Sequence, residues 1–145
     1  LAVRVAPALA ALLAFVTIFA AALGCAAIPS DIKTARPGES FTLRVGESAS
    51  VQGASMVIKF LEVAGDSRCP KGEQCVWEGD AIVRISLRRG LEPPEKQDLH
   101  TSSREPDAQA GGGYATRLVR LDPQPVTGRP IPQADYLATL QVDPE

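Results

Sequence analysis

The chain has 145 residues, of which 22% are charged, and its 15 basic and 17 acidic side chains give a formal net charge of −2. This length suits one domain and is short for two. No basic run occurs and aromatic residues make up only 5% of the chain, which argues against a nucleic-acid partner.

Residues 1–24 are predicted to be a secretory signal rather than part of the fold. Arg4 is followed by an apolar stretch that ends in small residues, and the next charged residue is Asp31. A short basic start, an apolar run and a small-residue end are typical of a signal peptide. A transmembrane helix is the alternative, because about 20 apolar residues span a bilayer. The alanine-rich composition, Pro7 and the cysteine after the run favour cleavage.

The segment Ala22-Leu23-Gly24-Cys25 resembles the bacterial lipobox, in which a lipoprotein signal peptidase cuts before a cysteine that carries diacylglycerol. Gly24 and Cys25 match the motif, whereas Ala22 stands where leucine is usual. The resemblance implies lipid attachment at Cys25 and a membrane partner held through that anchor, which is stable when two or three acyl chains insert. Ala26 is not the aspartate that marks inner-membrane retention, so an outer-membrane location is expected in a Gram-negative organism. Ordinary cleavage after the alanine triplet 20–22 remains the alternative.

Residues 25–39 are predicted to be a tether from the lipid to the domain. Residues 26–39 contain two prolines and small side chains, with no periodic apolar pattern. The folded domain is then expected over residues 40–145.

Alternating apolar residues predict the first strands of the domain. The segments 41–45 and 49–51 flank Gly46-Glu47, so a hairpin is expected there. Residues 55–64 are apolar on both faces, which predicts a central strand or one that changes face at a bulge. A short helix is the alternative, and the β-branched content argues against it.

The second half of the domain shows the same pattern of short alternating segments. Residues 90–95 are expected to form a turn, 102–113 a flexible loop and 122–132 a proline-rich connection that cannot lie inside a sheet. Further strands are expected over 81–88, 96–101 (an edge strand), 114–121 and 136–142. About seven short strands without a convincing helix predict an all-β fold, either an antiparallel β-sandwich or a small barrel.

Residues 66–80 hold two of the three cysteines and the single tryptophan. If Cys25 carries lipid, Cys69 and Cys75 remain as a pair in an oxidising compartment, where they would close a seven-residue ring worth about 2 kcal/mol. Their spacing is not Cys-x-x-Cys, and without a nearby histidine they form only half a zinc site. The four acidic residues of the segment lack the spacing of an EF-hand. We therefore expect a disulfide and no metal or cofactor.

Trp77 leaves two alternatives open. On an extended chain it projects to the same side as Cys75, so its indole would pack against the disulfide. If it is exposed instead, it is a candidate binding anchor, since tryptophan is favoured at interface hot spots.

No set of catalytic residues is marked in the sequence. His100 is the only histidine, and it is expected on the surface of an edge strand. No Gly-x-Ser-x-Gly motif occurs, and the two loop cysteines are explained by their pairing. We expect that the protein is not an enzyme.

The Ser67-Arg68-Cys69-Pro70 and Cys75-Val76-Trp77 segments, within a region from about Phe41 to Val142, carry a resemblance to a group of small, uncharacterised bacterial exported proteins and lipoproteins. In that group a Ser-Arg-Cys-Pro segment precedes a Cys-Val-Trp segment. The resemblance implies export, the disulfide and a β domain, and it implies no catalytic residue.

The expected function is that of a non-catalytic envelope lipoprotein whose β-sandwich binds a protein or a cell-surface component. The alternative is a secreted peptidase inhibitor or small-ligand-binding module. It would use the loops 66–80, 102–113 and 122–132 gathered at one end of the sandwich.

Overall fold

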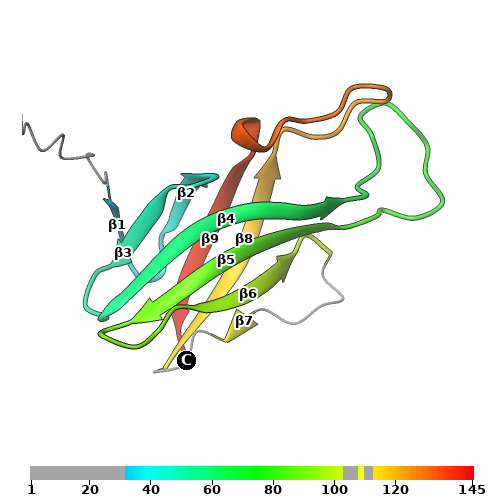
Figure 1. The fold of residues 1–145 in the computed structure, drawn as a ribbon. Helices are drawn as coiled ribbons and strands as arrows, with labels where there is room; N and C mark the ends of the chain where they lie inside the picture. The colour runs from blue at the N-terminus through cyan, green and yellow to red at the C-terminus, as the bar shows by residue number, and fades with distance from the viewer. Residues whose placement is uncertain (1–31, 103–107, 110–112) are drawn as a thin grey trace, which may run out of the picture. The chain divides into compact units, whose positions relative to one another are not determined.

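A computed structural model describes residues 32–102, 108–109 and 113–145, which form two β-sheets (Figure 1). The five-stranded sheet has the order β1-β3-β4-β5-β6, with β1 (Ile32–Ala35), β3 (Ser48–Val51), β4 (Met56–Asp66), β5 (Ala81–Arg89) and β6 (Glu95–His100). The four-stranded sheet has the order β2-β9-β8-β7, with β2 (Ser40–Arg44), β9 (Leu137–Pro144), β8 (Tyr114–Asp122) and β7 (Ala108–Gln109). Neither sheet closes into a barrel, so the predicted all-β sandwich is confirmed.

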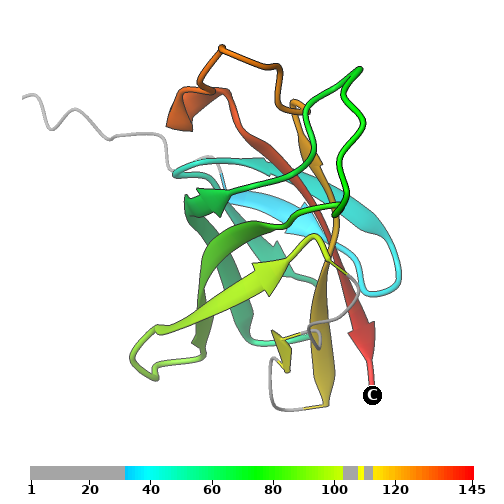
Figure 2. The same ribbon diagram turned by 90° about the vertical axis from the view of Figure 1, so that its right-hand side faces the viewer.

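The two sheets lie face to face around one apolar core (Figure 2). Each strand contributes alternate residues, because successive side chains of a strand point to opposite faces of its sheet. Phe60 and Ile85 of the first sheet and Leu43 and Leu140 of the second are fully buried. Buried and less buried residues alternate along β5 and β9, so the alternation predicted for these strands is confirmed.

Strand β4 lies in the middle of its sheet and contains a bulge, after which the buried residues fall on odd-numbered instead of even-numbered positions. The sequence predicts such a strand. Met56, Ile58 and Phe60 are buried, and after a register shift between Phe60 and Glu62 the next buried residue is Val63. Strand β3 pairs with β4 only as far as Lys59, so the second half of β4 extends beyond it. There the side-chain amide of Gln133 donates to the Val63 carbonyl and accepts from the Val63 amide, both at 2.9 Å.

The hairpin predicted from residues 41–51 is wrong. Strand β2 pairs with β9, whereas β3 pairs with β4, so the two neighbours lie in different sheets. Gly46, with a φ of 91°, donates its amide to the Phe60 carbonyl at 2.8 Å and turns the chain from one sheet to the other. Alternation predicts which residues are buried, but it does not say which sheet the strand joins.

The prediction that the tether extends to residue 39 is also wrong. Strand β1 begins at Ile32 and pairs in parallel with β3, and Ala35 is buried in the core. Within the described residues, the folded part therefore already includes Ile32–Ala35 instead of beginning at residue 40. With only one buried residue in four, β1 carries almost no periodic signal in the sequence.

The remaining elements follow the sequence with small changes. Strand β6 is an edge strand, as predicted, and the proline-rich connection leads through a single turn of 3-10 helix, η1 (Gln133–Asp135), into β9. The loop predicted over 102–113 contains β7, and its residues 103–107 and 110–112 lie outside the described residues. The predicted signal peptide and Cys25 lie outside them too. Within the part that the structure describes, no helical segment has the length and hydropathy of a membrane span.

Candidate functional site

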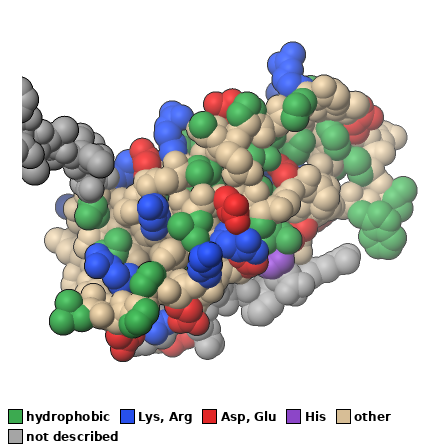
Figure 3. Space-filling model, viewed as in Figure 1, with side chains coloured by type: hydrophobic (Ala, Val, Ile, Leu, Met, Phe, Trp, Pro, Cys, Tyr) green, Lys and Arg blue, Asp and Glu red, His purple; other side chains and the backbone are tan. Residues whose placement is uncertain are grey.

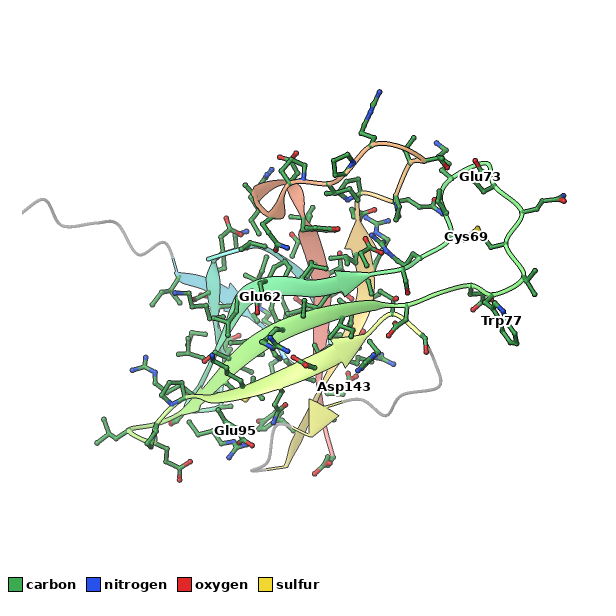
Figure 4. The ribbon with its side chains drawn as sticks, turned by 45° about the vertical axis from the view of Figure 1, so that its right-hand side comes forward. Glu62, Cys69, Glu73, Trp77, Glu95 and Asp143 are labelled. Carbon is green, nitrogen blue, oxygen red and sulfur yellow. A yellow bond between two sulfur atoms is a disulfide. The ribbon has the colours of Figure 1, made fainter. Side chains whose placement is uncertain are left out.

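Residues 67–80 connect β4 to β5 and form a protruding loop, here called the stapled loop (Figure 4). Cys69 and Cys75 are joined by a disulfide, with their Cα atoms 5.9 Å apart. The predicted pairing, and its position between two core strands, are confirmed. The bridge closes a ring that contains Pro70 and Gly72, two residues that favour turns.

The base of the stapled loop continues the pairing of β4 with β5. The Ser67 amide donates to the Asp80 carbonyl at 2.7 Å, and the Cys69 amide donates to the Glu78 carbonyl at 3.0 Å. Gly79 lies between these contacts with a φ of 71°, and a Cβ at this position would be 1.9 Å from the Ser67 carbonyl oxygen. The two sides of the loop can approach this closely only with glycine at position 79.

The side chain of Arg68 fixes the root of the loop to the other sheet. Arg68 Nε and Nη2 donate to the two carboxylate oxygens of Asp66 at 2.8 and 2.6 Å, and both side chains are largely buried. The same guanidinium donates to the carbonyls of Leu121 at 2.5 Å and Pro123 at 2.9 Å. A planar guanidinium suits such simultaneous contacts. Arg68 thus links the end of β4 to the end of β8.

Tyr136 completes this buried network. Its hydroxyl donates to Asp66 Oδ2 at 3.1 Å. Burial alone would raise the pKa of Asp66, but hydrogen bonds from Arg68 and Tyr136 and the charge of Arg68 outweigh it and hold that pKa below its ordinary value. Burial and the adjacent Asp66 carboxylate raise the pKa of Tyr136 to about 12.

The stapled loop also contacts residues 123–136, the proline-rich connection between β8 and β9. The Lys71 amide donates to the Pro125 carbonyl at 2.9 Å, and Thr127 Oγ1 donates to Glu73 Oε1, also at 2.9 Å. The two segments lie side by side at one end of the domain (Figure 1). Two of the three loops singled out in the sequence are therefore gathered, while most of the third lies outside the described residues.

Trp77 lies on the outer side of the stapled loop and points into solvent (Figure 4). Its exposed fraction is 72%, and that of the neighbouring Val76 is 89%. Packing of the indole over the disulfide, the first of the two alternatives, is therefore wrong. The chain bends at Val76-Trp77, so residues 75 and 77 do not project to the same side as they would on an extended strand.

A hollow of about 620 Å³ lies beside the exposed pair. It is lined by the loop base and by one residue after β6, namely Ser67, Val76, Trp77, Glu78, Gly79, Asp80 and Ser102. Another molecule could contact both the exposed apolar side chains and the polar hollow beside them.

His100 is held at the base of the loop and is not the freely exposed residue that the sequence predicts. Its Nδ1 lies 2.5 Å from Asp80 Oδ2, while Thr101 Oγ1 and the Ser102 amide donate to Asp80 Oδ1 at 3.0 and 2.9 Å. Burial raises the pKa of Asp80, but these hydrogen bonds prevail and lower it. The strand register brings the two residues together by placing His100 opposite Ile82. These contacts tie the start of β5 to the end of β6.

Three of the four acidic residues at positions 66–80 have separate side-chain partners, and the fourth, Glu78, is exposed. Asp66 binds Arg68, Asp80 binds His100, and Glu73 accepts from Thr127. Within residues 32–102, 108–109 and 113–145, no three histidine, cysteine, aspartate or glutamate residues are grouped so that they could hold a metal ion. The arrangement supports a rigid display of side chains.

No protein-family model, curated protein or solved structure matches this chain.

Proposed function

We propose that the chain is a non-catalytic, lipid-anchored protein of the bacterial cell envelope that binds a protein partner through Val76 and Trp77. Two adjacent exposed apolar side chains on a protruding loop form a patch that a partner can cover, and tryptophan is among the residues that contribute most to binding free energy. The observation that carries the proposal is the exposure of this adjacent pair on a stapled loop.

The contacts around the loop support rapid and tight recognition. The disulfide, the Arg68 contacts and the hydrogen bond from Lys71 to Pro125 hold the loop in one conformation before a partner arrives. A preordered loop loses less conformational entropy on binding than a mobile one does. Exposed Glu73 and Glu78 flank the apolar pair. We therefore expect basic residues around the pocket that receives Trp77.

The envelope location is supported by the sequence alone. The apolar start of the chain, the lipobox-like segment and the pairing of the remaining two cysteines agree with export followed by lipid attachment at Cys25. Mass spectrometry of the mature N-terminus tests this part. A mature chain that begins at a residue other than Cys25, without lipid, would overturn it.

A peptidase inhibitor or small-ligand module is the second candidate. The joined stapled loop and proline-rich connection at one end of the domain favour it. Inhibition of a protease panel by the wild-type protein at micromolar concentration, abolished by Trp77→Ala, would support this alternative over an envelope partner.

The binding proposal is tested by photo-crosslinking in intact envelopes followed by affinity measurement with the identified partner. The matched variants are Trp77→Ala and Leu91→Ala, since Leu91 is fully exposed at the opposite end of β5. Truncation of a hot-spot tryptophan weakens binding by about 30-fold or more. We expect this loss for Trp77→Ala and wild-type affinity for Leu91→Ala. Equal affinity of the two variants would contradict the proposal.

A further inference from the structure

The outer face of the five-stranded sheet carries a group of basic side chains, here called the basic face and defined by Lys59, Arg88 and Lys96. The strand register places Lys59 of β4 opposite Ser86 of β5, and Ser86 opposite Lys96 of β6. Arg88 follows two residues after Ser86 and so projects from the same face. Figure 3 shows Lys and Arg side chains on the face of this sheet that is turned to the viewer.

The cations of the basic face are not neutralised by their neighbours. Beside them, Arg84 bonds to both Glu62 and Asp98, at 2.9 and 2.8 Å, and so holds the two acidic residues of this face. Lys59, Arg88 and Lys96 form no ion pair with any other described residue. With Arg84 counted, this outer side of the sheet has four cations against two anions, on a chain whose formal net charge is −2.

Strand β1, the first described element, begins beside the basic face. Ile32, the first residue of β1, lies opposite Ser48, and Ser48 lies opposite Lys59, so the row of the sheet that begins at Ile32 leads directly to Lys59 and Lys96. The six residues 26–31 separate Cys25 from Ile32. Fully extended, the seven steps from Cys25 to Ile32 reach at most about 25 Å. A lipid on Cys25 would therefore keep this face close to the membrane surface.

We infer that the basic face lies on anionic phospholipid headgroups of the membrane in which the chain is anchored. The inference rests on the lipid anchor of the proposed function. A short anchor raises the local concentration of headgroups at the face, so that weak contacts suffice for docking. Each lysine or arginine near an anionic bilayer strengthens association roughly fivefold, which gives about 100-fold for three.

Lysine footprinting tests the inference, because the chain contains four lysines that differ in position. Lys59 and Lys96 lie on the basic face, whereas Lys71 is exposed on the stapled loop and is the internal control. The protein is isolated from its native envelope, reconstituted on vesicles of phosphatidylcholine with or without phosphatidylglycerol, and acetylated with an amine-reactive ester. Mass spectrometry then gives the reactivity of each lysine.

We expect severalfold protection of Lys59 and Lys96 on the anionic vesicles only, with Lys71 unchanged. The protection should disappear at about 1 M salt, where the screening length falls to about 3 Å. The triple variant Lys59→Ser, Arg88→Ser and Lys96→Ser should lose salt-sensitive docking, measured by energy transfer from Trp77 to a headgroup dye, whereas Lys71→Ser should retain it. Equal reactivity of Lys59 on both vesicles would overturn the inference.

The outcomes separate the inference from the function on which it rests. If the protein floats with neutral vesicles but Lys59 and Lys96 are not protected on anionic vesicles, docking of the basic face is overturned while the lipid anchor is supported. Failure to float with neutral vesicles would reject the anchor, and the inference with it. Equal protection by soluble polyglutamate would point to an acidic protein partner and overturn the membrane assignment.

Discussion

The guanidinium of Arg68 holds the carboxylate of Asp66 through two hydrogen bonds, although only one residue separates the two in the chain. Because the same guanidinium reaches the carbonyls of Leu121 and Pro123, this pair joins the two sheets at the end that bears the stapled loop. The network is largely buried, so its members depend on one another.

Removal of Arg68 should therefore destabilise the whole domain. Arg68→Met leaves the Asp66 carboxylate buried without its cation and removes two contacts to the other sheet. We expect a loss of about 3 kcal/mol in the free energy of unfolding, measured by urea denaturation. The control is Arg84→Met on the outer face, where the ion pairs are solvent-exposed and the loss should be small. Equal losses for the two variants would contradict a structural role of the buried network.

The pH dependence of stability should show the lowered carboxylate pKa values. The native pKa values of Asp66 and Asp80 are lowered from the ordinary aspartate value, so the unfolded chain binds protons at a higher pH than the native protein does. Their contribution is present in full above about pH 5 and is lost as the pH falls through 3.8 toward the native values. Urea denaturation between pH 7 and acid should show this loss.

The variant Asp66→Asn should be less stable at neutral pH and should lose less stability on acidification. Leu91→Ala, which changes an exposed side chain far from both carboxylates, should keep the wild-type profile. An unchanged acid profile in Asp66→Asn would show that this carboxylate does not contribute.

Because the two sides of the loop approach closely at Gly79, substitution of Gly79 should cost more stability than substitution of Gly72. Gly79 and Gly72 both have positive φ, but only at Gly79 does an added Cβ meet backbone, whereas at Gly72 nothing lies within 4 Å. Gly72→Ala should cost about 1 kcal/mol for its left-handed backbone. Gly79→Ala adds a clash and should cost about 3 kcal/mol in total. Thermal unfolding of the two variants makes the comparison, and a cost at Gly79 no larger than at Gly72 would refute the close packing of the loop base.

The disulfide should contribute modestly to stability and more strongly to binding. Replacing Cys69 and Cys75 by serine should lower the free energy of unfolding by about 2 kcal/mol, as expected for so short a ring. The freed loop should bind the partner more weakly, because its ordering then accompanies binding. A dithiol reductant should lower both the free energy of unfolding and the affinity for the partner in the wild-type protein. The double-serine variant should not respond to the reductant.

The fold was predictable from the sequence wherever one face of a strand is buried without interruption. Strands β5 and β9 alternate strictly between buried and open positions, and the bulge in β4 shows as a change of apolar face. Partner choice was not predictable, since the short segment between β2 and β3 looks like a hairpin turn although it connects two sheets. Strand β1 was missed because it buries one residue only.

The candidate site was predictable only in part. Cysteine number and spacing predict the bridge, but the position of Trp77 depends on a bend that an extended-chain argument leaves out. The hydrogen bond from Tyr136 to Asp66 joins residues 70 positions apart, and no local sequence pattern predicts it. The contact of His100 with Asp80 follows from the register of β5 with β6, which becomes known only with the fold.

The side-chain amide of Gln133, which pairs with both backbone groups of Val63, has a mechanical consequence. It fastens the proline-rich connection to β4, while Arg68 fastens the root of the stapled loop to the end of β8. A force applied to Trp77 would therefore be transmitted to both sheets. It would not act on the pairing of β4 with β5 alone. Such a force would load the domain as one body, which would suit the proposed role of holding a partner at the cell surface.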